Sequence, residues 1–268
     1  MKKHLSVFGL YARSSIFKIM GILLLMGGVQ IALFAKNYFP SISASSSASD
    51  VNDMIWQGDT ASIHFLQNYI EMSGISKICL VGFLLLTFVL CMTGTEYSSK
   101  TSYTLKRLSV SEKSTYFHQA VYNTFAYVLF GAVQLVIIFI IGTIFAETAP
   151  AESVHKQVLF LTFYQDYFLH ALFPMEDGLL WFRNVCWLIA LGAATADFPY
   201  VQRRGSKFNM SLVVILVMVI GFGGNHRAFS EGPIGSMGNC IFTSFVAVMV
   251  VVYILACTVF AKEGSYEE

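Results

Sequence analysis

Residues 120–146, AVYNTFAYVLFGAVQLVIIFIIGTIFA, carry no Asp, Glu, Lys or Arg over 27 positions. A helix needs about 20 mostly apolar residues to cross the hydrocarbon core of a bilayer. This stretch is therefore predicted to form a membrane-spanning helix. The 268-residue chain as a whole is 56% hydrophobic and 12% charged, whereas a soluble domain has about a quarter charged residues. The composition predicts a polytopic membrane protein.

Six apolar stretches of this kind predict an all-α membrane protein that forms a single transmembrane domain over residues 1–268. The predicted spans are residues 16–35, 76–95, 120–146, 178–196, 207–224 and 240–261. Arg183 lies near one end of the fourth span, where an arginine side chain can reach the membrane interface. Small residues at helical spacing in that span permit close contact with a helix of the same subunit or of another one. They are Ala190, Gly192, Ala194 and Ala196.

The fifth span has a strongly apolar part of only twelve residues, SLVVILVMVIGF, which is about 18 Å long as a helix. It is followed by a glycine-rich segment, residues 221–239. Irregular backbone at membrane depth is tolerated where protein buries it or where it lines a wet cavity. We therefore expect a re-entrant element at residues 221–239, with a simple exposed loop as the alternative.

The distribution of Lys and Arg sets the predicted orientation, because cytoplasmic segments carry an excess of both. With a cytoplasmic N-terminus, the inner segments hold twelve of these residues and the outer segments five, and the outer segments hold ten of the sixteen acids. We therefore expect a multi-pass protein of the plasma membrane with both termini in the cytoplasm.

The segments outside the spans also carry patterns. Residues 1–15 place Leu5 and Phe8 at helical spacing among basic residues, which predicts an amphipathic helix on the inner leaflet. The outer loops, 36–75 and 147–177, are long. The first contains DTASIHFLQNYIEM, a candidate short helix, and the second contains VLFLTFYQDYFLHALF, whose aromatic residues suit a helix in the membrane interface.

Motifs of common enzyme classes are missing from the sequence. It contains no GxxxxGK[ST], HExxH, GxSxG or CxxC pattern, so it predicts no nucleotide, metal or disulfide site in this chain. The net charge of +1 does not favour nucleic acid as a partner. Asp166 and His170 lie four residues apart and are the one candidate pair for acid–base chemistry or metal binding. A polar stripe on an interfacial helix is the preferred explanation of the pair, because no third partner can be identified.

The polar segment 96–118 lies between the second and third spans, on the predicted cytoplasmic side. Residues 101–108, TSYTLKRL, can form two helical turns, with Tyr103 and Arg107 on one face. Ser109 and Glu112 match an S-x-x-E capping box, which predicts that a new helix starts at Ser109 and continues into the third span. The expected structure is a short helix parallel to the membrane, joined by a sharp turn to a long one.

The order of an amphipathic N-terminal helix, two spans, the sequence TLKRLSVS and a long third span resembles the membrane subunits of ABC-2 type transporters. The residues that carry the resemblance are Thr104, Leu105, Leu108, Val110 and Ser111, with Glu96 ahead of them. Ser109 stands where the family usually has proline, and the outer loops are longer than usual. The glycine-rich segment before the last span also resembles the re-entrant element of the family.

The resemblance implies a coupling helix that contacts a separate ABC ATPase and a permease that works as a pair, with itself or a related chain. The implied contact residues are Thr101, Tyr103, Thr104, Leu105, Lys106, Arg107 and Leu108. ATP and magnesium would bind to the partner ATPase, so this chain would hold no cofactor and would not itself be an enzyme. The expected function is ATP-driven export of an apolar or amphipathic substrate (a peptide, lipid or drug), as in peptide-antibiotic efflux and immunity systems of bacterial plasma membranes.

Two alternatives remain open from the sequence. The chain can be a membrane scaffold or sensor that docks a cytoplasmic partner without transport. It can also be an intramembrane enzyme centred on Asp166 and His170.

Overall fold

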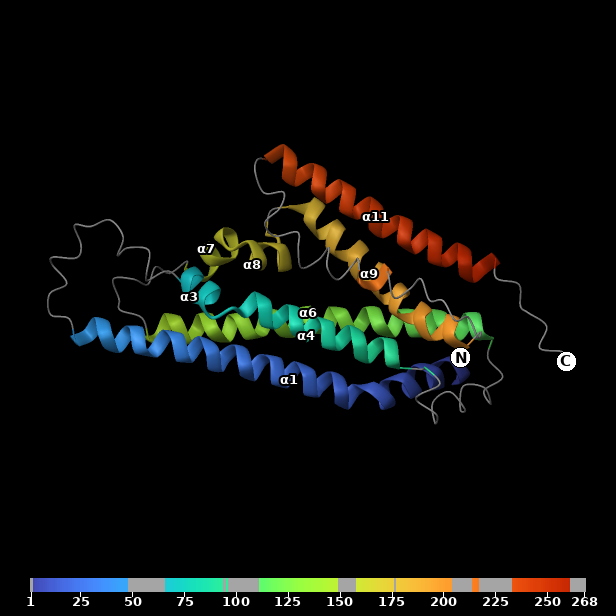
Figure 1. Cartoon of the computed structure of the whole chain (residues 1–268), viewed down its shortest axis with the longest axis horizontal. Coiled ribbons are helices and arrows are strands. Elements are labelled where there is room, and N and C mark those ends of the chain that lie inside the picture. The colour runs from blue at the N-terminus through green and yellow to red at the C-terminus, as the bar shows by residue number, and fades with distance from the viewer. Residues whose placement is uncertain are drawn as a thin grey trace. The chain divides into compact units, whose positions relative to one another are not determined.

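A computed structural model shows an all-α chain over the residues that it describes (Figure 1). These are residues 2–47, 66–93, 95, 111–148, 158–175, 177–203, 214–216 and 233–260. The helices are α1 (Lys2–Ser47), α3 (Leu66–Met72), α4 (Ile75–Met92), α6 (Glu112–Thr148), α7 (Val158–Gln165), α8 (Tyr167–Leu172), α9 (Gly178–Arg203) and α11 (Pro233–Phe260).

Four helical segments are long and apolar enough to cross a membrane: Phe8–Pro40, Ile75–Met92, Glu112–Thr148 and Gly178–Arg203. They contain or closely match the first four predicted spans, at 16–35, 76–95, 120–146 and 178–196. The predicted last span lies mostly in α11, whose described apolar part is Cys240–Ala256. Of the predicted span at 207–224, only the short helical piece 214–216 belongs to the described residues. The chain is thus a helical protein with four candidate spans, which indicates a multi-pass membrane protein.

The amphipathic pattern of residues 1–15 predicts a helix that runs into the first span, and α1 continues through both without a break. Within α1 the hydroxyls of Ser14 and Ser15 donate to the backbone oxygen of Tyr11 at 3.1 and 2.8 Å. The helix is longer than the sequence suggested at its C-terminal end. There α1 runs through Pro40 to Ser47, so the first part of the predicted loop 36–75 is helical.

Both predicted interfacial segments contain short helices. The segment DTASIHFLQNYIEM forms α3 in its second half. The segment VLFLTFYQDYFLHALF forms two helices rather than one, because Asp166 takes an extended backbone conformation (φ −83°, ψ 120°) and caps α8. The first two turns of α11 occupy residues 233–239 of the predicted re-entrant segment, and the rest of that segment lies outside the described residues.

The chain divides into two compact units, and α1, α4 and α6 each contribute to both. The first unit contains Met1–Gly21, Leu84–Leu129 and Asp177–Glu268. The second contains Ile22–Phe83 and Phe130–Glu176.

In the first unit, α9 packs closely on α6 and also on α11 (Figure 1). Gly192 of α9 faces the backbone of α6, where an added Cβ would lie 2.9 Å from the nitrogen of Thr124 and 3.0 Å from the oxygen of Ala120. Real Cβ atoms essentially never approach another atom within 3.0 Å. The neighbouring small residues Ala190, Ala194 and Ala196 are fully buried. The small-residue pattern therefore serves a helix contact within this chain.

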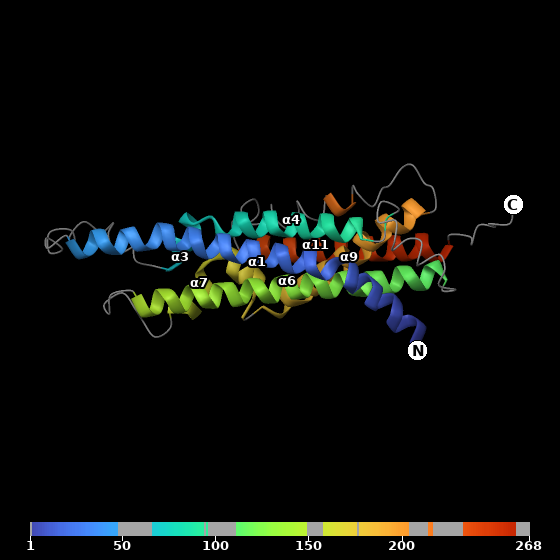
Figure 2. The ribbon, with the colours of Figure 1, turned by 90° about the horizontal axis from the view of Figure 1, so that it is seen from below.

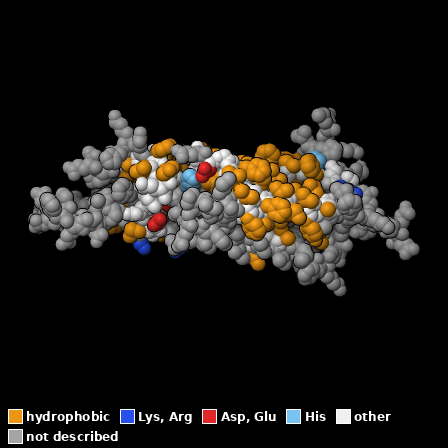
Figure 3. Space-filling view, turned by 90° about the horizontal axis from the view of Figure 1, so that it is seen from above, with side chains coloured by type: hydrophobic (Ala, Val, Ile, Leu, Met, Phe, Trp, Pro, Cys, Tyr) orange, Lys and Arg blue, Asp and Glu red, His pale blue; other side chains and the backbone are white. Residues whose placement is uncertain are grey.

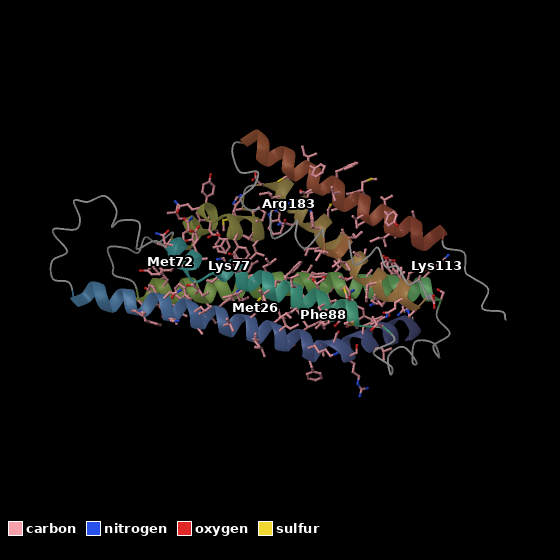
Figure 4. The ribbon with its side chains drawn as sticks, in the orientation of Figure 1. Met26, Met72, Lys77, Phe88, Lys113 and Arg183 are labelled. Carbon is pink, nitrogen blue, oxygen red and sulfur yellow. The ribbon has the colours of Figure 1, made fainter. Side chains whose placement is uncertain are left out.

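In the second unit, an aromatic cluster around Tyr38 joins three helices. The Tyr38 ring lies 5.1 Å from Tyr69 of α3 and 5.3 Å from Phe145 of α6, between ring centroids. Its hydroxyl accepts a hydrogen bond from Thr148 at 3.0 Å. In the same unit Met26 of α1, labelled in Figure 4, packs against Gly82 of α4.

Contacts within each unit show in which direction the long helices run. In the second unit Gln30 meets Gln134 and Tyr38 meets Phe145, so α1 and α6 run in parallel (Figure 2). In the first unit Thr87 meets Tyr127 and Thr93 meets Gln119, so α4 runs antiparallel to α6. The pairs Tyr116–Tyr200 and Thr124–Gly192 make α9 antiparallel to α6 as well. Within the first unit α6 thus opposes both α4 and α9, and within the second unit it runs parallel to α1.

Large hydrophobic side chains cover much of the described surface. In Figure 3 the described side chains of α11 gather in a hydrophobic patch, to which Phe242, Phe245 and Tyr253 belong. On α1, Phe17 is 85% exposed and Leu24 is 71% exposed. Surfaces of this kind are rare on soluble monomers and common on proteins that face lipid or a partner.

We predict that Gly192→Ala destabilises the protein by about 1–3 kcal/mol, because the new methyl group must push apart two backbone segments. The matched control is Gly131→Ala in α6, where an added Cβ meets nothing within 4 Å. Alanine has the higher helix propensity, so this control is expected to be neutral or slightly stabilising. Thermal unfolding of both variants in the same detergent measures the difference, and equal melting temperatures would contradict the close helix contact.

Candidate functional site

The predicted ATPase-contact residues, 101–108, lie outside the described residues, as does Ser109. The structure does show where the following helix begins. The Ser111 hydroxyl accepts a hydrogen bond from the backbone nitrogen of Ser114 at 3.3 Å, and α6 starts at Glu112. Ser111, and not the predicted Ser109, therefore caps this helix. Both serines fit the cap preference, and the one directly before the first helical residue takes the role.

A row of buried polar side chains follows α6 in the first unit. Gln119 Nε2 donates to the backbone oxygen of Thr93 at 2.7 Å, and Asn123 Nδ2 donates to Thr195 Oγ1 at 2.9 Å. The Tyr127 hydroxyl donates to Thr87 Oγ1 at 3.1 Å. Residues 119, 123 and 127 recur every four positions and so share one helical face. We call this set of hydrogen bonds the α6 polar seam.

The N-terminal part of α1 joins the same unit through hydroxyl groups. The Ser15 and Tyr122 hydroxyl oxygens lie 2.6 Å apart. Because the Ser15 hydroxyl donates to the backbone oxygen of Tyr11, Tyr122 is the donor in this pair. The ring of Tyr122 also packs against Phe8, with centroids 5.3 Å apart. The hydrogen bond between Ser15 and Tyr122 thus lies beside the aromatic ring of Phe8.

The second unit holds a pair of buried glutamines. Gln30 Nε2 donates to Gln134 Oε1 at 3.1 Å and to the backbone oxygen of Ile75 at 3.3 Å. Both side chains are 0% exposed. This amide pair connects α1, α6 and the first residue of α4.

Two charged residues, Arg183 and Asp197, lie within α9, the fourth candidate span, away from its terminal residues. The fourth span was predicted to end at residue 196, but α9 continues to Arg203 and thereby includes Asp197, whose side chain is 8% exposed. Asp197 was not identified as a membrane residue from the sequence, because it lies one residue beyond the predicted end of the span. Arg183, labelled in Figure 4, binds Asn184 Oδ1 at 3.1 and 3.3 Å and lies 4.0 Å from Cys240 Sγ. Ionisable groups at such positions are expensive to bury, which makes both residues functional candidates.

The predicted Asp166–His170 pair has a structural role in the described contacts. Asp166 Oδ1 accepts a hydrogen bond from the backbone nitrogen of Leu169 at 3.0 Å, as an N-cap does. The ring of His170 packs edge-on against Tyr164. Burial raises the pKa of Asp166 above its ordinary range, while the backbone N–H groups of Leu169 and Phe168 oppose that rise.

No three His, Cys, Asp or Glu side chains among the described residues come together as a metal site would require. The described cysteine side chains are free thiols, and Cys79, Cys91 and Cys240 are buried as small apolar groups would be. Comparison with protein-family models, curated proteins and solved structures found no match for this chain.

The polar seam is the site that reasoning from sequence missed. Its signal was the four-residue spacing of Gln119, Asn123 and Tyr127 within an otherwise apolar stretch. The partners Thr93 and Thr195 lie 26 and 72 positions away in the sequence. The described hydrogen bonds of the seam join neutral groups on neighbouring helices, which holds these helices in register.

We predict that Gln30→Leu or Gln134→Leu alone costs about 1–3 kcal/mol, because each removes the hydrogen bond between the two buried amides. Gln30→Leu leaves Gln134 Oε1 without its donor, whereas Gln134→Leu leaves Gln30 with its bond to Ile75. The double variant is expected to cost less than the sum of the two. Couplings of this type between membrane helices average ~0.6 kcal/mol and reach ~1.7 kcal/mol. A double-mutant cycle on unfolding in detergent measures the coupling, and strict additivity would show that the two amides do not interact.

We predict that Asp166→Ala destabilises the protein by about 1 kcal/mol through loss of the α8 cap. Asp166→Asn keeps an acceptor for the cap and removes the charge. Because the folded-state pKa is raised, the contribution of Asp166 to stability is largest at low pH and falls as pH rises through that pKa. Asp166→Asn is therefore expected to equal or exceed the wild type near neutral pH and to lose this pH dependence. Melting temperatures across acidic to neutral pH test the prediction, and a destabilised Asp166→Asn would contradict it.

Proposed function

We propose that the chain is the permease subunit of an ATP-driven ABC transporter of the ABC-2 type. It has six spans in the plasma membrane, with both termini in the cytoplasm, and a second permease, identical or related, completes the translocation path. Separate ATPase subunits bind ATP and magnesium. The substrate is apolar or amphipathic, such as a peptide, lipid or drug, and the direction is export.

The directions of the helices within each unit support a multi-pass arrangement of this kind. Since α1 and α6 run in parallel and α4 and α9 oppose α6, consecutive candidate spans can cross a bilayer in opposite senses. Within the first unit, the N-terminal part of α1 meets the N-terminal part of α6 at Tyr122. With a cytoplasmic N-terminus, the start of α6 is then near the cytoplasmic side, where the ATPases bind.

The observation that carries the proposal is the continuity of α6. It begins at Glu112, a few residues after the predicted coupling residues 101–108, and remains one helix of 37 residues to Thr148. At ~1.5 Å per residue its length is about 55 Å, well over the hydrocarbon core of about 30 Å. A rigid helix of that length passes motion of its first turn into the membrane domain.

The hydrogen bonds of the α6 polar seam would transmit this motion to neighbouring helices. Gln119 binds the end of α4 and Asn123 binds α9, so a shift of the first turns of α6 reaches both helices. At the contact with the ATPase, Leu105 and Leu108 contribute burial of up to about 2 kcal/mol each. Lys106 and Arg107 pair with acidic residues of the ATPase.

We predict that Leu105→Asp combined with Arg107→Glu abolishes co-purification of the ATPase with this chain and its stimulation by the chain. The changes place negative charge where the proposal needs an apolar contact and a cation. Co-expression with the candidate ATPase, affinity purification and an ATPase assay in lipid nanodiscs measure both effects.

The matched control is Lys77→Glu, which reverses an exposed charge in the first turn of α4. This position is at the end of α4 opposite to the end that precedes residues 101–108. It is expected to leave the complex intact. Unchanged co-purification and ATPase activity in the Leu105→Asp, Arg107→Glu variant would show that this segment does not couple to an ATPase. Capture of a cytoplasmic protein that has no ATPase activity would favour the scaffold alternative.

A further inference from the structure

Two buried amides on α6 keep a carbonyl oxygen that receives no hydrogen bond from the described part of the chain. Gln119 and Asn123 are both 0% exposed, and Gln119 Oε1 and Asn123 Oδ1 have no hydrogen-bond partner among the described residues. Leaving such a group unpaired costs about 1–3 kcal/mol. The large majority of buried polar side-chain atoms in proteins are paired with protein or ordered water. Two unpaired acceptors one helical turn apart therefore call for a ligand.

The hydrogen bonds of each amide indicate which of its two atoms is the oxygen. Gln119 Nε2 lies 2.7 Å from the backbone oxygen of Thr93, where a carbonyl oxygen would be repelled. Asn123 Nδ2 lies 2.9 Å from Thr195 Oγ1. The proton of the Thr195 hydroxyl goes to the backbone oxygen of Leu191, at 2.8 Å, or of Gly192, at 3.2 Å. With Asn123 as the donor, the Thr195 hydroxyl both accepts from Asn123 and donates to the backbone, which is one hydrogen bond more than the reversed amide would make. This orientation of Asn123 is therefore favoured, and the reversed orientation of Gln119 is excluded by repulsion.

The two side chains leave the same face of α6, because they are four residues apart. Side chains four residues apart on a helix have Cβ atoms about 5–6 Å apart, so a single small ligand can reach both. The amide nitrogens are held by the end of α4 on one side and by α9 on the other. The oxygens are therefore not free to rotate towards other donors.

We propose that Gln119 Oε1 and Asn123 Oδ1 form a buried binding site for a small ligand that presents positive charge to two carbonyl oxygens. The ligand is a water molecule, which donates one hydrogen to each oxygen, or a monovalent cation such as Na⁺ or K⁺. Both side chains are neutral, whereas sites for Ca²⁺ and Mg²⁺ use carboxylates. The Gln30–Gln134 pair differs, because there the unused atoms are one acceptor, Gln30 Oε1, and one donor, Gln134 Nε2.

An experimental structure of the full chain in lipid nanodiscs tests the site directly. At a resolution that shows ordered water elsewhere in the protein, we expect a density peak within hydrogen-bonding or coordination distance of both oxygens. The peak is expected to be absent from the Gln119→Leu, Asn123→Leu double variant. An empty space between the two oxygens in the wild type would overturn the proposal, and this result does not depend on whether the variant folds.

Melting temperatures in NaCl, KCl and choline chloride at equal ionic strength distinguish the two ligands. A cation that binds the folded state raises the melting temperature in proportion to the logarithm of its concentration once the site is nearly saturated. A rise in one metal salt that choline does not reproduce, lost in the double variant and kept in Gln134→Leu, identifies a cation. Equal melting temperatures together with the density peak identify water. Equal melting temperatures without the peak would contradict both.

Discussion

Every polar side chain inside the apolar helices of this protein has to find a partner within the chain, because a lipid tail offers none. This requirement organises the structure around α6. Gln119, Asn123 and Tyr127 each bind a neighbouring helix or its end, and in the second unit Gln134 binds α1. Each hydrogen bond fixes one neighbouring helix in position and rotation. Apolar contacts alone would not do so, since lipid is as apolar as leucine.

Close packing adds a second constraint of the same kind. Gly192 lets α9 approach the backbone of α6, and the hydroxyl of Thr195, one turn further along, accepts the hydrogen bond of Asn123. The small residue brings the helices together, and the polar pair fixes their register. Large side chains such as Phe17 and Phe242 are left on the surface, where a bilayer can cover them. Other bulky side chains, such as Phe34, Tyr38 and Phe145, are buried, so small, polar and large residues all contribute to the interior.

The existence of the long helices could be predicted from the sequence, and several of their ends could not. Hydropathy over about 20 residues locates a span, but ends depend on single hydrogen bonds. Helix α1 continues through Pro40 to Ser47, and Ser111 rather than Ser109 caps α6. The partners in the polar seam are far apart in sequence, so no local pattern reveals them. The role of residues 101–108 stays a prediction.

The order of synthesis determines when the hydrogen bond between Asn123 and Thr195 can form. The partner of Gln119 is Thr93, which is synthesised before it, whereas Thr195 follows Asn123 by 72 residues. At about 5–20 residues per second, the ribosome needs about 4–14 s to reach it. During that interval α6 carries an asparagine whose final partner does not yet exist. The translocon, or neighbouring lipid and water, must hold the helix until α9 arrives, so late insertion of α9 completes a helix that was made much earlier.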